Sequence, residues 1–153
     1  MNNLRTYIRE VIVESKKEKK SAGVVIVKKF DKEWRVLILK DKKGRFDITK
    51  GLLEDGETFF QGAVREALEE SGIFLDEDNF IWGKDSFSYG KGKAFVAATE
   101  QTPFILPNPE TGEFEHVDWA WLDFKDAKNN VIDYLRPSIE WAESMIFSGK
   151  ARN

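Results

Sequence analysis

The sequence predicts a mixed α/β fold in which a mixed β-sheet lies between helices. Segments rich in β-branched and aromatic residues stand before and after a central amphipathic helix, and helical patterns stand at both ends of the chain. The 153 residues, of which 41% are hydrophobic and 33% charged, suffice for one domain with a sizeable core. We therefore expect an N-terminal amphipathic helix over residues 1–20 and a single domain over residues 21–149.

The first segment is predicted to be helical because apolar residues recur in it at helical spacing, at Leu4, Ile8, Val11 and Ile12. It ends in the basic run KKEKK at residues 16–20. We expect this helix to dock on the domain and to leave its basic end in solvent. The alternative is an anchor for nucleic acid or for a partner protein.

The strands before the central helix are indicated by β-branched and aromatic residues. Residues 21–30 and 34–39 predict a hairpin, and residues 46–49 predict a short further strand. Beyond the helix we expect strands at 79–88, 93–99 and 115–122, with a Pro-, Asn- and Gly-rich loop at 101–113. Helical patterns close the chain at 123–129, 131–135 and 137–147.

The central helix has clear start and stop signals. Thr58 and Gln61 have the spacing of a capping box, and Gly72 suits the C-cap. Its expected core face carries Phe60, Val64, Ala67 and Leu68. The opposite face carries three neighbouring carboxylates, those of Glu66, Glu69 and Glu70.

Three like charges on one helix face repel one another. Such a cluster is often only a solvated surface, but this one follows a glycine-flanked acidic loop at residues 51–57. Hard divalent cations such as Mg²⁺ bind carboxylate oxygens together with substrate phosphates. The pattern therefore favours a cation site.

Residues 51–73 resemble the Nudix box of the Nudix hydrolase family, with the pattern Gx5Ex7REUxEExGU, where U is a bulky apolar residue. The fixed positions are matched in register by Gly51, Glu57, Arg65, Glu66, Glu69, Glu70, Gly72 and Ile73. Ala67 is smaller than usual, and Thr49-Lys50-Gly51 replaces the usual Pro-Lys-Gly. The resemblance implies a Nudix-type α/β/α sandwich over about residues 21–147.

A second resemblance concerns the last strand. The segment EHVDWAWL at 115–122 is similar to a Glu-His and Trp-Leu segment of diadenosine tetraphosphate hydrolases, and Ser21-Ala22-Gly23 resembles the start of that subfamily. In these enzymes the glutamate reaches the metals, which implies that role for Glu115. The opening of the chain also weakly resembles phage-encoded proteins.

The resemblance implies a site for one to three Mg²⁺ or Mn²⁺ ions. The implied ligands are Glu57, Glu66, Glu69, Glu70, Glu115 and the main-chain carbonyl of Lys50. The implied catalytic residues are Glu69, Glu70, Glu115 and Arg65, with Arg65 holding the acidic loop against the helix. We choose Glu115 as the general base, while a box glutamate, Glu100, Glu110 and Glu113 remain alternatives.

Substrate contacts are implied for Lys50, Tyr89, Lys91 and Lys93, although the last three also suit an ordinary exposed hairpin turn. The implied reaction is attack by water on a nucleoside diphosphate linked to another group, with a dinucleoside polyphosphate as the favoured substrate. The alternatives are an ADP-ribose pyrophosphatase, an RNA 5′-pyrophosphohydrolase and a non-catalytic nucleotide-binding module. Residues 82–88 lack the proline that is common in ADP-ribose enzymes.

The composition of the chain limits which partners and metal sites are expected. The net charge is −3, so general attraction to nucleic acid or to anionic membranes is not expected. An RNA 5′ end is the one nucleic-acid partner that stays open. The chain has no cysteine and one histidine, which excludes disulfides and multi-histidine metal centres. Without a long apolar run or a signal-peptide pattern, we expect a soluble cytoplasmic protein with a small-molecule nucleotide partner.

Overall fold

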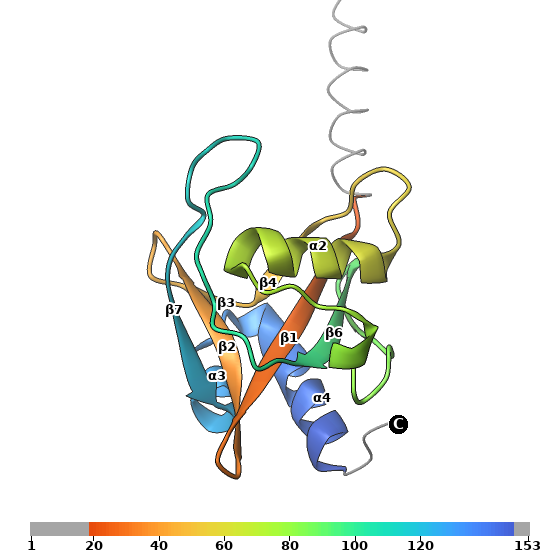
Figure 1. The fold of residues 1–153 in the computed structure, drawn as a ribbon, viewed down its shortest axis with the longest axis vertical. Helices are drawn as coiled ribbons and strands as arrows, with labels where there is room; N and C mark the ends of the chain where they lie inside the picture. Colours follow the sequence, from red (N-terminus) through yellow and green to blue (C-terminus); the bar gives the residue numbers. More distant parts are fainter. Residues whose placement is uncertain (1–18, 149–153) are drawn as a thin grey trace, which may run out of the picture.

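The computed structural model describes residues 19–148, and its elements run through a seven-stranded mixed sheet with helices on both faces (Figure 1). The strands are β1 (Ser21–Phe30), β2 (Glu33–Asp41), β3 (Phe46–Asp47), β4 (Thr49–Leu52), β5 (Phe87–Tyr89), β6 (Gly92–Ala98) and β7 (His116–Asp123). The α-helices are α2 (Phe59–Ser71), α3 (Phe124–Asn130) and α4 (Arg136–Phe147). Single 3-10 turns occupy η1 (Glu77–Asn79) and η2 (Asp133–Leu135).

The sheet is built around β1. The main strand order is β3-β2-β1-β6-β5, with β4 paired to β1 and β7 paired to β2. Among the strand pairs of residues 19–148, only β1 and β6 run parallel, with Val25 opposite Val96, and the other strand pairs are antiparallel. The expected mixed sheet between helices is therefore confirmed.

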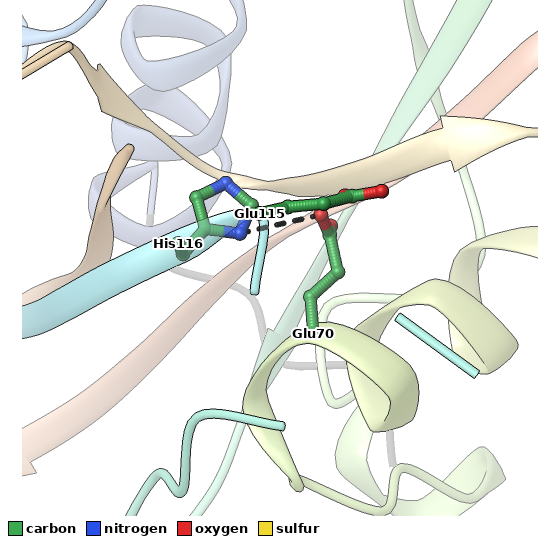
Figure 2. Close-up of side chains that lie close together, drawn as sticks. All are labelled: Glu70, Glu115 and His116. Carbon is green, nitrogen blue, oxygen red and sulfur yellow. Dashed lines mark ion pairs between the residues drawn. The ribbon is translucent and has the colours of Figure 1, made fainter. Parts of the chain in front are cut away.

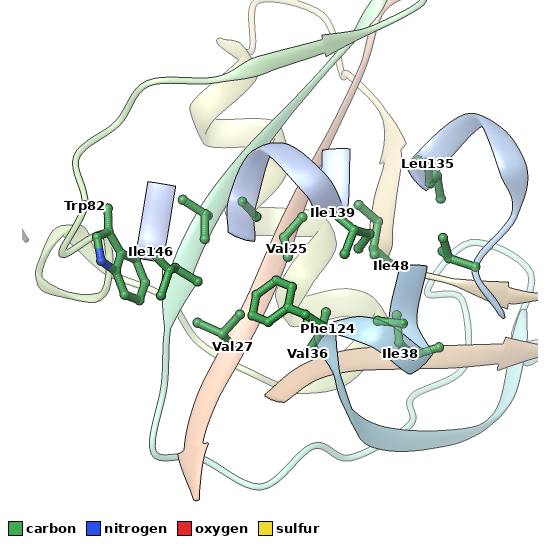
Figure 3. Close-up of a cluster of buried hydrophobic side chains, with 14 residues drawn as sticks. Val25, Val27, Val36, Ile38, Ile48, Trp82, Phe124, Leu135, Ile139 and Ile146 are labelled. Atoms are coloured by element: carbon green, nitrogen blue, oxygen red, sulfur yellow. The ribbon is translucent and has the colours of Figure 1, made fainter. Parts of the chain in front are cut away.

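Strand β1 is buried on both faces because a helical layer covers each side of the sheet. Val25 and Val27 point into the cluster that α3 and α4 cover, as Figure 3 shows for that core. Val24 and Ile26 point into the opposite cluster, beneath α2. This placement holds α2 firmly across the sheet.

The termini of α2 follow the sequence signals. Thr58 is the N-cap and accepts a hydrogen bond from the amide of Gln61, whose side chain in turn accepts one from the amide of Thr58. Gly72 ends the helix in the left-handed region at φ 71°, where residues with a side chain are strained. The predicted capping box and C-cap are confirmed.

Two expectations about buried faces and strands were wrong. Leu68 is 42% exposed and Glu70 is only 8% exposed, because α2 is rotated so that Ala63, Ala67 and Glu70 face the sheet. The strand expected at 79–88 is limited to β5. Residues 80–86 are irregular, and their aromatic side chains Phe80 and Trp82 fill the two cores without joining the sheet.

Smaller differences concern the ends of elements. Strand β2 extends further than 34–39, and the strand expected at 46–49 is divided into β3 and β4. The helical pattern at 131–135 forms only the 3-10 turn η2. The helix expected over residues 1–20 lies outside the described residues, apart from Lys19 and Lys20, which are not helical. Within residues 19–148, no helix combines the length and apolar character needed to cross a membrane.

Candidate active site

A cavity of about 1130 Å³ lies between the acidic loop, the face of α2 that carries the glutamates and the loop before β7. Carboxylates dominate its lining, with Glu54, Asp55, Glu57, Glu66, Glu69, Glu70, Glu110 and Glu115. The cationic side chains in the lining are Lys19, Lys20, Lys50 and Arg65. The cavity thus brings together the implied metal ligands from three separate segments of the chain.

Gly51 makes room for the first box glutamate. A Cβ on Gly51 would lie 2.3 Å from the carboxylate carbon of Glu66, so only a glycine lets this carboxylate rest against β4. The side chain of Glu66 is only 13% exposed, and this burial raises its pKa, which Arg65 partly opposes. A cation beside Glu66 would remove this penalty by favouring the charged form.

Arg65 ties the acidic loop to α2. Its Nε and Nη2 donate to the two carboxylate oxygens of Glu57 at 2.7 and 3.0 Å, and Nη2 also donates to the main-chain carbonyl of Leu52. Its Nη1 reaches Glu66 at 2.9 Å and Glu69 at 3.0 Å. These bonds lower the pKa of Glu57, so the loop carboxylate is held charged. The arrangement agrees with the loop-holding role expected for Arg65.

Glu70 is the buried member of the cluster. Its Oε1 accepts a hydrogen bond from the amide of Lys50 at 2.7 Å, and its Oε2 lies 3.5 Å from Nδ1 of His116. Burial raises the pKa of Glu70 well above its usual value, and the neighbouring carboxylates of Glu66 and Glu115 add to this. A buried carboxylate among other carboxylates needs a counter-charge to stay ionised at neutral pH.

Glu115 and His116 approach Glu70 from the start of β7, as Figure 2 shows. One ligand atom from each of these three side chains lies within 4.8 Å of the others. Glu115 is exposed, and its Oε1 accepts a hydrogen bond from Nδ2 of Asn108 at 2.7 Å. The structure thus brings Glu115 to the box glutamates, whereas Glu100 and Glu113 are not among the cavity-lining residues.

Lys50 has its main chain and its side chain in different environments. Its amide supports Glu70, while its Nζ lies 3.2 Å from Oδ2 of Asp47 and over the ring of Tyr134. Burial alone would lower the pKa of Lys50. The attraction to Asp47 outweighs this effect, so the pKa lies above its usual value. The ammonium group is therefore paired within the protein in this structure.

The other expected substrate contacts lie outside the cavity lining. The hydroxyl of Tyr89 accepts a hydrogen bond from Ser21 at 3.0 Å, and its ring lies 6.3 Å from that of Tyr134. Lys93 places its Nζ 4.8 Å from the ring centre of Phe59, at the start of α2. Lys91 is exposed in the β5–β6 turn.

The donor set fits Mg²⁺ or Mn²⁺. Glu66, Glu69, Glu70 and Glu115 line the cavity and carry hard oxygen donors, and the cradle at Gly51 exists only because no Cβ occupies it. Burial raises the pKa values of Glu66 and Glu70, so a cation bound beside them would favour their charged forms. Bound here, the ion would be held by these carboxylates.

Sequence reasoning did not identify Asp47 or Asn108 as part of this site. Asp47 is buried beside Lys50 and lies 3.9 Å from His116, and Asn108 orients Glu115. His116 is far from Asp47 along the chain, and the contact of Asn108 with Glu115 depends on how the loop between them folds, so no local pattern marks either residue.

With this geometry established, comparison with known proteins decides the family. The family model of the NUDIX domain matches residues 17–142. The chain belongs to the Nudix family. Nudix hydrolase 2 of Arabidopsis thaliana is 26% identical over 98 residues, which are 58% of this chain and 35% of that protein. This Nudix chain therefore spans about a third of the length of that curated relative.

Solved structures share the fold. A C. elegans Ap4A hydrolase in a binary complex superposes with a TM-score of 0.64 at 23% identity, over 86% of this chain and 99% of that one. The NUDIX domain of Shewanella oneidensis NrtR, complexed with ADP ribose, superposes with a TM-score of 0.59 at 13% identity. The match covers 83% of this chain and 87% of that one. At these identities the solved structures show that the fold is shared.

Proposed function

We propose that the protein is a Mg²⁺-dependent pyrophosphohydrolase that cleaves a dinucleoside polyphosphate, such as diadenosine tetraphosphate, into mononucleotides. The observation that carries the proposal is the convergence of Glu66, Glu69, Glu70 and Glu115 on one cavity. The fold shared with a C. elegans Ap4A hydrolase supports the choice of substrate.

The box residues would hold and orient the cation. Glu66 is placed by Gly51, Glu70 by the Lys50 amide, and Glu69 by Arg65. When bound, the divalent cation lowers the pKa of the attacking water and screens the charge of the phosphates. Positioning of this kind accounts for most of the catalysis in phosphoryl transfer.

We propose Glu115 as the group that accepts the proton of the attacking water. Its carboxylate is exposed to the cavity, whereas that of Glu70 is buried against His116. As water attacks phosphorus, the new P–O bond forms, the bridging P–O bond breaks, and the leaving phosphate departs with the electron pair. The hydrogen bond from Asn108 keeps Glu115 in place during this step.

A second substrate class is ADP-ribose. The related Nudix domain of Shewanella oneidensis NrtR is described in complex with ADP ribose, although its fold alone is shared at 13% identity. The chemistry at the metal-binding carboxylates would be the same, because both substrates contain a pyrophosphate linkage.

The test is a substrate panel with purified protein and Mg²⁺. The panel comprises dinucleoside polyphosphates, ADP-ribose, sugar nucleotides, deoxynucleotides and triphosphorylated RNA. We expect mononucleotides from the dinucleoside polyphosphates, and we expect Glu69→Gln to lower kcat by about a hundredfold or more. Glu140→Gln, an exposed carboxylate on α4, is the matched control and should keep full activity. Near wild-type activity in Glu69→Gln would overturn the site assignment.

A further inference from the structure

The cationic side chains of the cavity differ in how they are engaged. The guanidinium of Arg65 is bonded to Glu57, Glu66 and Glu69. The ammonium of Lys50 is paired with Asp47. Neither group has its charge available for an anionic substrate without giving up a carboxylate partner.

Among the residues that the structure describes, Lys19 and Lys20 are the other two cations in the lining, and both are exposed. Among residues 19–148, no carboxylate lies within ion-pair distance of either ammonium. They therefore line a cavity that also contains eight carboxylates, without being paired to any of them. An anion that enters the cavity therefore meets unpaired positive charge at this edge.

The main chain at this edge is fixed. The amide of Leu53 donates to the carbonyl of Lys20 at 2.9 Å, which attaches Lys20 to the end of β4, two residues after Gly51. The Nζ of Lys20 lies 5.7 Å from the ring centre of Phe59, at the start of α2. Lys93 approaches the same ring at 4.8 Å, so a third ammonium flanks the edge.

From this arrangement we infer that Lys19 and Lys20 bind the phosphates of an oligophosphate chain that lie furthest from the metal-binding carboxylates. The inference rests on the proposed hydrolase function and adds a determinant of substrate length. A bound cation neutralises the phosphates at the box glutamates, but a longer chain carries further charge toward the cavity edge. Lysines bind such phosphates as point charges.

The same chemistry would suit a dinucleoside polyphosphate or the triphosphate end of an RNA. The two sources differ in the length of the phosphate chain and in the group attached to its far end, so parallel substrates distinguish them. For a dinucleoside polyphosphate, dependence on the lysines should increase from the triphosphate to the pentaphosphate. For an RNA 5′ end, both lysines should matter equally whatever the sequence of the RNA.

The experiment compares the full-length wild type with Lys20→Gln and with the double variant Lys19→Gln/Lys20→Gln. With a diadenosine tetraphosphate, we expect KM to rise about tenfold in the double variant, with kcat within about twofold of wild type. The effect should be smaller for the triphosphate, and should shrink at high salt because exposed charges are screened. Lys20→Arg should restore most of the affinity.

The matched control is Lys32→Gln. Lys32 is exposed just beyond the other end of β1, about 30 Å from Lys20 along a ten-residue strand at roughly 3.3 Å per residue. This variant removes one positive charge, as Lys20→Gln does, without altering the cavity. Its kinetic constants should match those of wild type, so that a general effect of net charge is excluded.

A direct binding measurement separates this inference from the proposed function. Calorimetry with a dinucleoside tetraphosphate that has methylene-bridged phosphates reports affinity without turnover. If wild type binds this analogue and the double variant binds it about tenfold more weakly, the inference holds even if no substrate is hydrolysed. Equal affinities for the analogue, or a KM independent of chain length in all variants, would overturn it.

Discussion

Gly51 lies directly against the carboxylate of Glu66, because a Cβ at Gly51 would come within 2.3 Å of both the carboxylate carbon and Oε1. The contact joins β4 to the helix that carries the box glutamates. The atom that would clash is the far end of a flexible side chain, so the fold can accept a substitution by moving Glu66. The position of this carboxylate therefore depends on the absence of a side chain at residue 51.

We predict that Gly51→Ala leaves the protein folded but displaces Glu66. Thermal unfolding should shift by only a few degrees, whereas kcat/KM should fall about a hundredfold, as expected for a misplaced catalytic group. Binding of Mn²⁺, followed by electron paramagnetic resonance, should weaken in parallel. Because both changes act on one carboxylate, Gly51→Ala should add little to Glu66→Gln. Full additivity of the two would contradict the proposed coupling.

Arg65 offers a second test, since its planar guanidinium bonds both oxygens of Glu57. In Arg65→Lys a single ammonium cannot make these paired bonds and also reach Glu69. We predict a loss of about 1–3 kcal/mol in the free energy of unfolding and about a hundredfold loss in kcat/KM. Chemical denaturation and steady-state kinetics measure the two effects.

Arg35→Lys is the matched control for this substitution. Arg35 pairs with Glu33 at 3.2 Å, and both side chains are substantially exposed. An exposed pair of this kind contributes little to stability, so the control should change neither property. A similar loss in both variants would show that Arg65 has no special role in holding the loop.

The limits of the helix that carries the box glutamates could be predicted from the sequence, but the rotation of this helix could not. Thr58, Gln61 and Gly72 act on neighbouring main-chain groups, so the limits of α2 follow from short-range chemistry. The placement of Glu70 depends instead on how α2 lies across the sheet, which also leaves Leu68 partly exposed. Helical periodicity alone does not determine this rotation.

Long-range contacts account for the rest. The alternating pattern at 79–88 predicted a strand, but an irregular segment over most of this range buries Phe80 and Trp82 equally well. Asp47 comes close to His116 only because β2 pairs with both β3 and β7. Neither contact has a local sequence pattern, so only the assembled sheet reveals it.

The buried Glu70 predicts an unusual dependence of stability on pH. Its pKa is raised well above the usual value, so the folded state binds more protons than the unfolded state above about pH 4.5. The free energy of unfolding of the metal-free protein should therefore lose a contribution as pH rises from the unfolded pKa through the folded pKa. Glu57 has a lowered pKa and acts in the opposite sense, losing its contribution as pH falls below its usual pKa.

Glu70→Gln isolates this effect, because the amide oxygen can still accept the hydrogen bond from Lys50. In metal-free protein, we predict that the melting temperature of the variant minus that of wild type becomes more positive as pH rises from about 4 to about 8. Mg²⁺ should then raise the melting temperature of wild type more than that of the variant. A pH-independent difference would show that Glu70 is not strained by burial.

The last prediction concerns the loop before β7, where Asn108 Nδ2 donates to Glu115 at 2.7 Å. The main chain of Asn108 is also bonded within the loop. Its main-chain N–H donates to the carbonyl of Glu113, and its main-chain carbonyl accepts from the N–H of Gly112. We predict that Asn108→Ala lowers kcat about tenfold, because Glu115 loses its fixed orientation. Substrate KM should change little, since no charge is removed.

Glu110→Gln provides the matched control, because Glu110 lines the same cavity from the same loop but is not held near Glu70. Its kcat should remain within about twofold of wild type, whereas Glu115→Gln should lose about a hundredfold. If Asn108 acts through Glu115, then Asn108→Ala should have no further effect in the Glu115→Gln background. If it instead lowers kcat equally in both backgrounds, Asn108 affects the reaction by another route, and the orientation of Glu115 is set by the start of β7 alone.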